Sequence, residues 1–165
     1  MNAYFHIIGC IASVQPNAPA IDECVDWVRR QDAEILAQND VEAVFVKFDA
    51  TDAELVLYGC RAAAFRRPPI LRFGFASGVK ESTAGSGGIP RMGERGIAQA
   101  CDLAGAAQPG QVLVSSQLGS LLQVAQVEPA DRLLPMHVKL LNGRMASAYA
   151  IESPRPVSTD GASGT

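Results

Sequence analysis

Hydrophobic and polar positions along the first 40 residues predict a buried strand and then an amphipathic helix. Residues 4–12 form a short apolar run rich in aromatic and β-branched side chains, which favours a strand over a helix. After Pro16 and Pro19, apolar residues recur at helical spacing from Ile21 to Leu36, with acidic residues near the start. We expect this strand and helix to begin the hydrophobic core.

The next segment allows two interpretations. Residues 43–48 predict a second strand, and residues 49–58 then predict a polar turn and a returning strand, so that the two strands form a hairpin. The alternative is a helix over residues 51–64, because Thr51 would cap it and Glu54 would complete a capping box. We prefer the hairpin.

Strands and helices alternate through the second half of the chain. The pattern first predicts a short helix near 60–66 ended by Pro68-Pro69, a strand at 70–76, and an exposed and mobile glycine-rich loop at 77–90. It then predicts a helix near 94–106, a Pro109-Gly110 turn, a strand at 112–114 and a helix capped by Ser116. The last element is a closing hairpin at 136–151 around a type I′ turn at Asn142-Gly143. This order predicts an α/β (α+β) domain, with a mixed sheet and flanking helices.

Composition limits the domain count and the class of partner. With 165 residues, 48% of them hydrophobic and 19% charged, the chain is long enough for one globular domain, which we place at residues 1–152. Residues 153–165 are rich in Pro, Ser and Gly and predict a disordered tail or linker. A net charge of -3 with scattered arginines disfavours nucleic-acid binding. No apolar run is long enough to span a bilayer, so we expect a cytoplasmic protein without a membrane segment.

The four cysteines, Cys10, Cys24, Cys60 and Cys101, are isolated in the sequence, with no histidine at metal-ligand spacing. We therefore expect each to be a small buried hydrophobic residue. The sequence predicts no bound metal and no cofactor.

The order of motifs between residues 70 and 115 resembles the second half of a class III adenylate/guanylate cyclase catalytic domain. The resemblance rests on a strand at 71–78, the glycine-rich loop, the sequence Gly93-Glu94-Arg95-Gly96-Ile97-Ala98-Gln99-Ala100-Cys101, and the sequence Gln108-Pro109-Gly110-Gln111-Val112. It extends over roughly residues 4–152 and implies a ferredoxin-like sheet with added strands. Because family members place their sites at a two-chain interface, the resemblance also implies a homodimer or a partner protein.

Four positions that carry chemistry in the family are changed in this chain. The Asn and Arg that lie one turn apart on the family's helix correspond to Ile97 and Cys101, and the first metal-binding Asp corresponds to Cys10. The position of the base-selecting Asp or Thr falls at Pro90. By resemblance, these are the degenerate positions of a cyclase-like site.

A few residues still match the family pattern. Asp52, on the expected hairpin turn, matches the second metal-binding carboxylate, and Lys47 is the rough counterpart of the base-selecting Lys. Arg91 and Arg95 could meet a phosphate, but we prefer the interpretation that both are solvated surface residues. One carboxylate cannot hold the two divalent ions that the cyclase reaction needs, so we predict no catalytic residues and no metal site.

The resemblance therefore predicts a non-catalytic cyclase-homology domain, which acts as a regulatory or dimerisation module in signalling. Its partners would be a second copy or another protein, and its candidate ligand is a nucleotide or another small molecule. The alternative is an adenylate or guanylate cyclase, converting ATP or GTP to a cyclic nucleotide, that is active only with a complementing subunit. No signature of a hydrolytic nucleophile with its base is present in the sequence.

Overall fold

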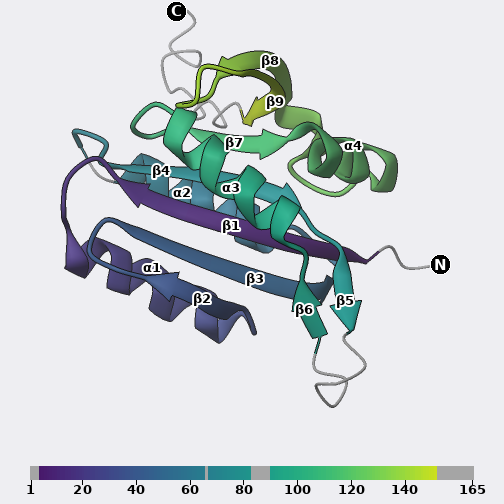
Figure 1. The fold of residues 1–165 in the computed structure, drawn as a ribbon, viewed down its shortest axis with the longest axis horizontal. Coiled ribbons are helices and arrows are strands. Elements are labelled where there is room, and N and C mark those ends of the chain that lie inside the picture. The colour runs from purple at the N-terminus through teal and green to yellow at the C-terminus, as the bar shows by residue number, and fades with distance from the viewer. Residues whose placement is uncertain (1–3, 66, 83–89, 152–165) are drawn as a thin grey trace, which may run out of the picture.

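The computed structural model describes residues 4–65, 67–82 and 90–151, and these form a three-layer α/β/α arrangement (Figure 1). The strands are β1 (Phe5–Ser13), β2 (Glu34–Gln38), β3 (Glu42–Ala50), β4 (Leu71–Ser77), β5 (Lys80–Ser82), β6 (Pro90–Met92), β7 (Val112–Ser115), β8 (Leu133–Lys139) and β9 (Met145–Ile151). The helices are α1 (Ala18–Arg30), α2 (Glu54–Phe65), α3 (Glu94–Ala106) and α4 (Ser116–Ala125), with a 3-10 turn at Ala130–Arg132. Among the residues described, no helix has the length and apolar character that a membrane crossing needs.

The main sheet has seven strands in the order β2-β3-β1-β4-β7-β9-β8. Its first four strands follow the connectivity β1-α1-β2-β3-α2-β4, which is the ferredoxin-like unit, and β7, β9 and β8 extend it beyond β4. Strands β4 and β7 are parallel, and the other neighbouring pairs are antiparallel. The predicted mixed sheet with flanking helices is confirmed.

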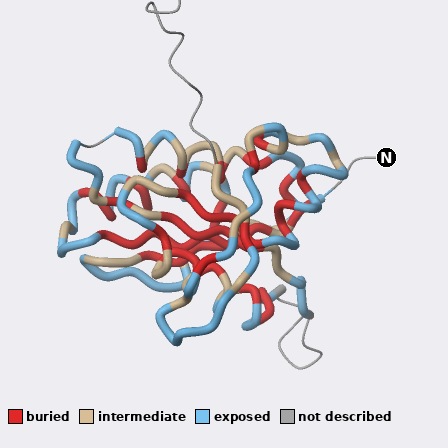
Figure 2. Tube along the Cα trace, turned by 90° about the horizontal axis from the view of Figure 1, so that it is seen from above, coloured by how far each residue is buried: buried red, intermediate tan, exposed pale blue. Residues whose placement is uncertain are grey.

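The two faces of the sheet bury separate hydrophobic clusters, with the most deeply buried residues in the central strands (Figure 2). Helices α1, α2 and α4 cover one face, where they enclose Phe45, Phe73 and Phe75. Helix α3 crosses the other face over β1 and β4 (Figure 1). Successive side chains along each central strand therefore point into different layers, one covered by α1, α2 and α4 and the other by α3.

Helix α3 lies unusually close to the sheet because β4 has a glycine beneath it. A Cβ at Gly74 would lie 2.2 Å from the Ala100 carbonyl oxygen and 2.5 Å from the Ala104 amide nitrogen. Both atoms belong to the helix backbone, so a side chain here would push the whole helix away. Gly74 pairs with Cys10 on β1, and the close approach therefore sets the position of α3 over that residue as well.

The hairpin expected from the strand at 43–48 and the returning strand up to residue 58 is wrong, since β3 runs to Ala50 and residues 54–58 begin α2. Its buried residues are Leu55, Val56, Gly59 and Ala63, which recur at helical spacing and not at the spacing of two that a strand requires. The first turn is capped by Asp52, whose Oδ1 accepts a hydrogen bond from the Glu54 amide at 3.1 Å, and not by Thr51. The alternative interpretation, a helix, is therefore correct, although Asp52 and not Thr51 caps it.

The first helix is shorter than its hydrophobic spacing indicated. It ends at Arg30, and Asp32 follows with a positive φ of 61°, which helical residues do not adopt. Ile35 and Leu36 belong to strand β2. Ile35 still packs against the cluster that α1 covers, so α1 and β2 bury apolar residues in the same cluster. In the sequence, the spacing of these residues resembles that of one longer helix.

Three smaller expectations also need correction. Strands β5 and β6 form a hairpin at the two ends of the loop predicted at 77–90, whose middle lies outside the described residues, as does the tail predicted from residue 153. Ser115 caps α4 in place of Ser116, because its side chain accepts from the Leu118 amide. At the tip of β8 and β9, Gly143 has φ of 87° and Asn142 has none in the positive range, so the turn is not type I′.

We predict that Gly74→Ala lowers the free energy of unfolding by about 2 kcal/mol or more, because the new methyl group meets helix backbone that cannot rotate away. Gly105→Ala is the matched control on α3, since its Cβ would meet only the Leu141 side chain, at 3.1 Å. We expect that variant to be neutral or stabilised by up to about 1 kcal/mol. Urea unfolding of both variants measures the difference, and equal effects would contradict a backbone contact at Gly74.

Candidate functional site

The side chains of Cys10 and Cys101 meet where α3 crosses β1. Cys10 is 0% exposed and its thiol donates to the Ile11 carbonyl at 4.0 Å, while the half-buried Cys101 side chain packs against the same cluster. The apolar cluster around this contact consists of Ile8, Ala12, Val44, Val46, Ala76, Met92, Ala100 and Ala104, with Phe48 and Ile97 at its edge. The place where the two changed family positions come together is thus a thiol pair in hydrophobic surroundings.

The interaction between the two neighbouring thiols shifts their pKa values in opposite directions. Interaction with the Cys101 side chain, together with burial, raises the pKa of Cys10 well above its ordinary value. The same interaction lowers the pKa of Cys101, although partial burial opposes the effect. Cys10 therefore stays protonated, and Cys101 is the sulfur that more readily carries negative charge.

Two charged residues flank the thiol pair on the same face of the sheet. Ala12 pairs with Glu42 on β3 and with Arg72 on β4, which places both two residues along the sheet from Cys10. The Glu42 charge raises the pKa of Cys10 after the larger effects of Cys101 and burial, and the Arg72 charge lowers it. Arg72 Nη1 donates to the Ala107 carbonyl at 3.3 Å, so this guanidinium is engaged at the carboxyl end of α3.

Three of the four changed family positions lie in this one cluster. Ile97 is half-buried one helical turn before Cys101, and both pack against the cluster that contains Cys10. Pro90 begins β6, where it pairs with Ser82, and its side chain lies outside the part of the chain that the structure describes. The sequence thus identified a set of residues that the fold does gather.

Asp52 does not lie on a hairpin turn, since it precedes α2. Strands β2 and β3 form a tight hairpin in the first half of the chain, and its turn carries Asn39 and Asp40. Asn39 Oδ1 accepts from the amides of Val41 and Glu42, both at 2.8 Å, which fixes the turn. Asp40 is therefore the turn carboxylate that the sequence analysis missed. The sequence signal for this turn was the Asn39-Asp40 pair between two hydrophobic runs. It was missed because the predicted first helix extended to Leu36.

The end of β1 beside this turn offers no second carboxylate. The Ser13 amide donates to the Val41 carbonyl at 2.7 Å, and the Ser13 hydroxyl donates to the Gln15 carbonyl at 2.6 Å. Among the residues described, no group of three or more His, Cys, Asp or Glu side chains could hold a metal ion. The donor set does not fit the two divalent ions of a cyclase, which need converging carboxylates.

Lys47 lies on the opposite face of the sheet from the thiol pair. Val46 and Phe48 pack with Cys10, and side chains alternate along a strand, so Lys47 shares the face of Phe45 that α1 and α2 cover. It cannot contact a ligand held beside Cys10 and Cys101. The match of Lys47 to the family's base-selecting Lys is therefore not supported by its position.

Arg91 and Arg95 are exposed near the amino end of α3. Arg91 lies on β6 and pairs with Glu81 on β5. The β5–β6 hairpin is attached to the sheet by an ion pair between Lys80 Nζ and Asp49 Oδ2 at 2.9 Å. The two arginines are thus close to the same helix terminus and open to solvent.

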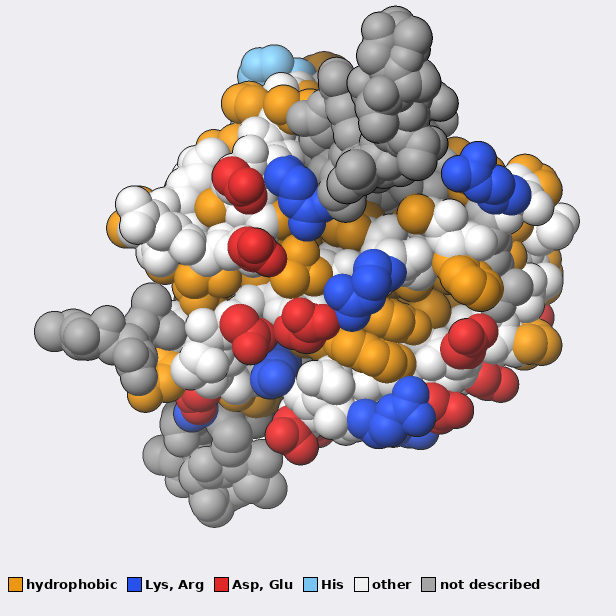
Figure 3. Space-filling model, turned by 180° about the vertical axis from the view of Figure 1, so that it is seen from behind, with side chains coloured by type: hydrophobic (Ala, Val, Ile, Leu, Met, Phe, Trp, Pro, Cys, Tyr) orange, Lys and Arg blue, Asp and Glu red, His pale blue; other side chains and the backbone are white. Residues whose placement is uncertain are grey.

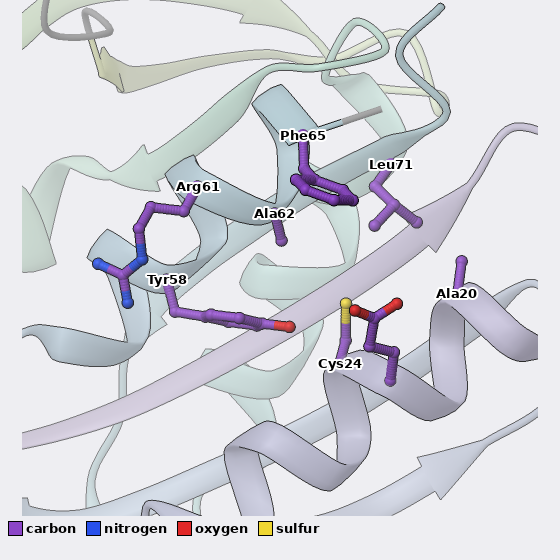
Figure 4. A pocket seen from close by; sticks show the side chains of 8 residues that line it. Ala20, Cys24, Tyr58, Arg61, Ala62, Phe65 and Leu71 are labelled. Carbon is purple, nitrogen blue, oxygen red and sulfur yellow. The ribbon is translucent and has the colours of Figure 1, made fainter. Parts of the chain in front are cut away.

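A pocket of about 160 Å³ opens on the face covered by α1 and α2 (Figure 4). Its lining consists of Ala20, Glu23, Cys24, Tyr58, Arg61, Ala62, Phe65 and Leu71. The Tyr58 ring stacks on Trp27 with 3.9 Å between centroids, and burial, followed by a hydrogen bond with Cys24, raises the Tyr58 pKa. Arg61 pairs with Glu54 at 2.8 Å. The interactions of Tyr58 with Trp27 and Cys24 join α1 to α2, whereas the Arg61–Glu54 pair lies within α2.

The outer surface of the α1/α2 face mixes hydrophobic patches with both signs of charge (Figure 3). Phe65, at the end of α2 and the rim of the pocket, is 78% exposed. Acidic and basic side chains alternate around the hydrophobic area, so this face has no single-sign field for a phosphate backbone (Figure 3). The pocket and the thiol pair are separated by the sheet.

Comparison with known proteins identifies the fold. The guanylate cyclase domain of RhGC from Catenaria anguillulae, in complex with GTP, superposes with a TM-score of 0.61 at 7% identity, covering 92% of this chain and 98% of that one. The monomeric guanylyl cyclase domain of the RhoGC fusion protein from Blastocladiella emersonii gives 0.58 at 8% identity, with 90% and 95% covered. The adenylyl cyclase CyaB from P. aeruginosa gives 0.52 at 11% identity, with 94% and 98% covered.

No protein-family model matches the chain, and no curated protein matches it. At 7% to 11% identity, the structural likeness shows the fold alone. The chain therefore has the fold of adenylyl and guanylyl cyclase catalytic domains, as its motif order predicted, over nearly the whole length of both chains.

We predict that Cys10→Asp lowers the free energy of unfolding by about 3 kcal/mol or more, because it places a carboxylate in an apolar cluster without a partner. Cys10→Ala is the matched control, for which we expect a loss near 1 kcal/mol from the small cavity. Urea unfolding with and without Mn²⁺ measures both. If Cys10→Asp is as stable as Cys10→Ala, or if Mn²⁺ restores its stability, position 10 opens onto a metal site and the description of a closed apolar cluster is wrong.

Proposed function

We propose that this chain is a non-catalytic cyclase-homology domain that acts in signalling through association, as a homodimer or as a regulatory module for a partner. One observation carries the proposal. The positions that we match to a metal-binding Asp and a transition-state Arg in cyclases are a buried thiol and a half-buried thiol in the same apolar cluster.

The chemistry of cyclisation explains why this contact supports a non-catalytic role. Two carboxylates must hold divalent ions against the triphosphate, and a fixed cation must answer the charge that develops on phosphorus. Neither Cys10 nor Cys101 supplies these groups. Asp40 is a single turn carboxylate, and Arg72 is engaged with the end of α3. A complementing subunit would therefore have to supply both halves of the site.

Nucleotide binding without turnover is part of the proposal. The fungal RhGC domain was solved with GTP, which shows that this fold accommodates a nucleoside triphosphate in that protein. In this chain, Arg91 and Arg95 are the exposed cations near the amino end of α3, and we assign phosphate contacts to them. Such binding would be independent of divalent metal, because no carboxylate pair accompanies these arginines in the proposal.

We assign self-association to the face that carries α3. Leu141, at the tip of the β8–β9 hairpin, is 85% exposed and lies against Gly105 of α3, and Met145 nearby is 64% exposed. A hollow of about 230 Å³ lies between this hairpin, α3 and the start of α4. Exposed apolar side chains beside a hollow suit a self-complementary contact between two copies. A cyclase domain of this fold from Blastocladiella emersonii has been described as a dimer.

We predict that Leu141→Glu weakens self-association at least about tenfold, because it places a charge in the centre of the proposed contact. Val124→Glu is the matched control, since Val124 is also 85% exposed but lies on α4. Sedimentation velocity over a concentration series measures both variants against the parent chain. A parent chain that stays monomeric at every concentration, or equal effects of the two substitutions, would contradict this assignment.

A further inference from the structure

We propose that Cys10 and Cys101 form an oxidation site, at which hydrogen peroxide converts the two thiols into a disulfide that joins β1 to α3. The inference rests on the arrangement of the cysteines and stands apart from the proposed function. It would hold equally for an active or an inactive cyclase-like domain.

The first support is the packing that brings the two residues together. Gly74 pairs with Cys10 across β1 and β4, and the α3 backbone at Ala100 and Ala104 rests directly on that glycine. Cys101 follows Ala100 on the helix and packs against the cluster that contains Cys10. Figure 1 shows α3 crossing the sheet over β1 and β4. The two side chains pack in one cluster where α3 crosses β1, and an S–S bond of about 2.05 Å would join them at this contact.

The second support is the difference in access between the two thiols. Cys101 is half-buried, whereas Cys10 is 0% exposed and lies beneath it. An oxidant from solvent can reach Cys101 and not Cys10. The interaction with Cys10 also favours the thiolate of Cys101, which is the reactive form. Cys101 is thus the residue that is attacked first, and Cys10 is the residue that completes the bond.

The reaction balances with hydrogen peroxide as the only oxidant. The Cys101 thiolate attacks one peroxide oxygen, an S–O bond forms as the O–O bond breaks, and the released hydroxide takes a proton to become water. The Cys10 sulfur then attacks the Cys101 sulfenic sulfur, and its proton leaves with the departing hydroxide as a second water. The two thiols lose two electrons and two protons in total, and one peroxide is reduced to two waters.

The other two cysteines provide internal controls. Cys24 is buried and hydrogen-bonded with Tyr58 on the opposite face of the sheet. Burial raises the pKa of Cys60 to about 11, so that its thiolate is scarce at neutral pH. Both belong to the cluster covered by α1 and α2, across the sheet from Cys101. We expect neither to take part in the bond.

The disulfide would close a loop from residue 10 to residue 101, which contains most of the ferredoxin-like unit. Such a link restricts the unfolded chain and fixes α3 against the sheet. For a domain of this size, we expect oxidation to raise Tm by about 5–10 °C. Reduction with a dithiol should reverse the shift.

The test treats the reduced full chain with hydrogen peroxide, blocks remaining thiols under denaturing conditions, and maps peptides by mass spectrometry without reduction. We expect two of the four cysteines to become unreactive and a single cross-linked peptide pair to contain Cys10 and Cys101. Cys60→Ala should leave this result unchanged. A link to any other cysteine, a link between two chains, Cys101 oxidised without a link to Cys10, or no modification would overturn the proposal.

A second measurement follows the order of steps. In Cys10→Ala, the completing thiol is absent, so we expect Cys101 to accumulate as the sulfenic acid, which dimedone labels, and the oxidation-induced rise in Tm to disappear. Cys101→Ala should prevent oxidation at Cys10 altogether because Cys10 is inaccessible. Equal labelling of Cys10 in that variant would overturn the assigned order. Peptide mapping of the parent chain gives the decisive result even if one variant does not fold.

Discussion

The contact between α3 and the central strands is the constraint on which the rest of the structure depends. Because Gly74 has no side chain, the helix backbone at Ala100 and Ala104 rests directly on β4. This position sets which α3 side chains face the sheet, and it brings Cys101 onto Cys10. A larger residue at position 74 would lift the helix and separate the two sulfurs. The geometry of the candidate site is therefore a consequence of helix–sheet packing.

The chain has the fold of cyclase domains, but the side chains packed at its candidate site differ from those that cyclase chemistry uses. The sheet order, the ferredoxin-like unit and the helix across its open face superpose on fungal and bacterial cyclase domains over more than 90% of this chain. Cyclase catalysis needs carboxylates and cations directed at a triphosphate, yet the side chains at the positions that we match to the family from the motif order are two thiols and an isoleucine within an apolar cluster. Burial and thiol pairing can maintain a fold and an association surface, but they cannot neutralise phosphate charge.

Sequence reasoning was most reliable where one element had one consistent pattern. The strand at residues 5–13 and the helix at residues 94–106 were predicted closely, and so was the grouping of Ile97 with Cys101. It failed where neighbouring elements share a face, because α1 and β2 bury side chains in the same cluster and resemble one long helix. Because of that error, the β2–β3 turn was not predicted, and the turn carboxylate was assigned to Asp52 and not to Asp40. The face of the sheet on which Lys47 lies was not predicted either. The contact of Cys10 with Cys101 depends on sheet pairing at Gly74, which local sequence patterns do not contain.

The most direct test of the non-catalytic account is a calorimetric titration of the parent chain with ATP and with GTP, each in Mn²⁺ and in Mg²⁺, with the same samples assayed for cyclic nucleotide. The account predicts no product and no binding that depends on the divalent ion, because the thiol pair and its apolar surroundings offer no site for metal-bound triphosphate. Binding that requires the metal and is accompanied by cyclic nucleotide would contradict it, and would place functional carboxylates elsewhere in the chain.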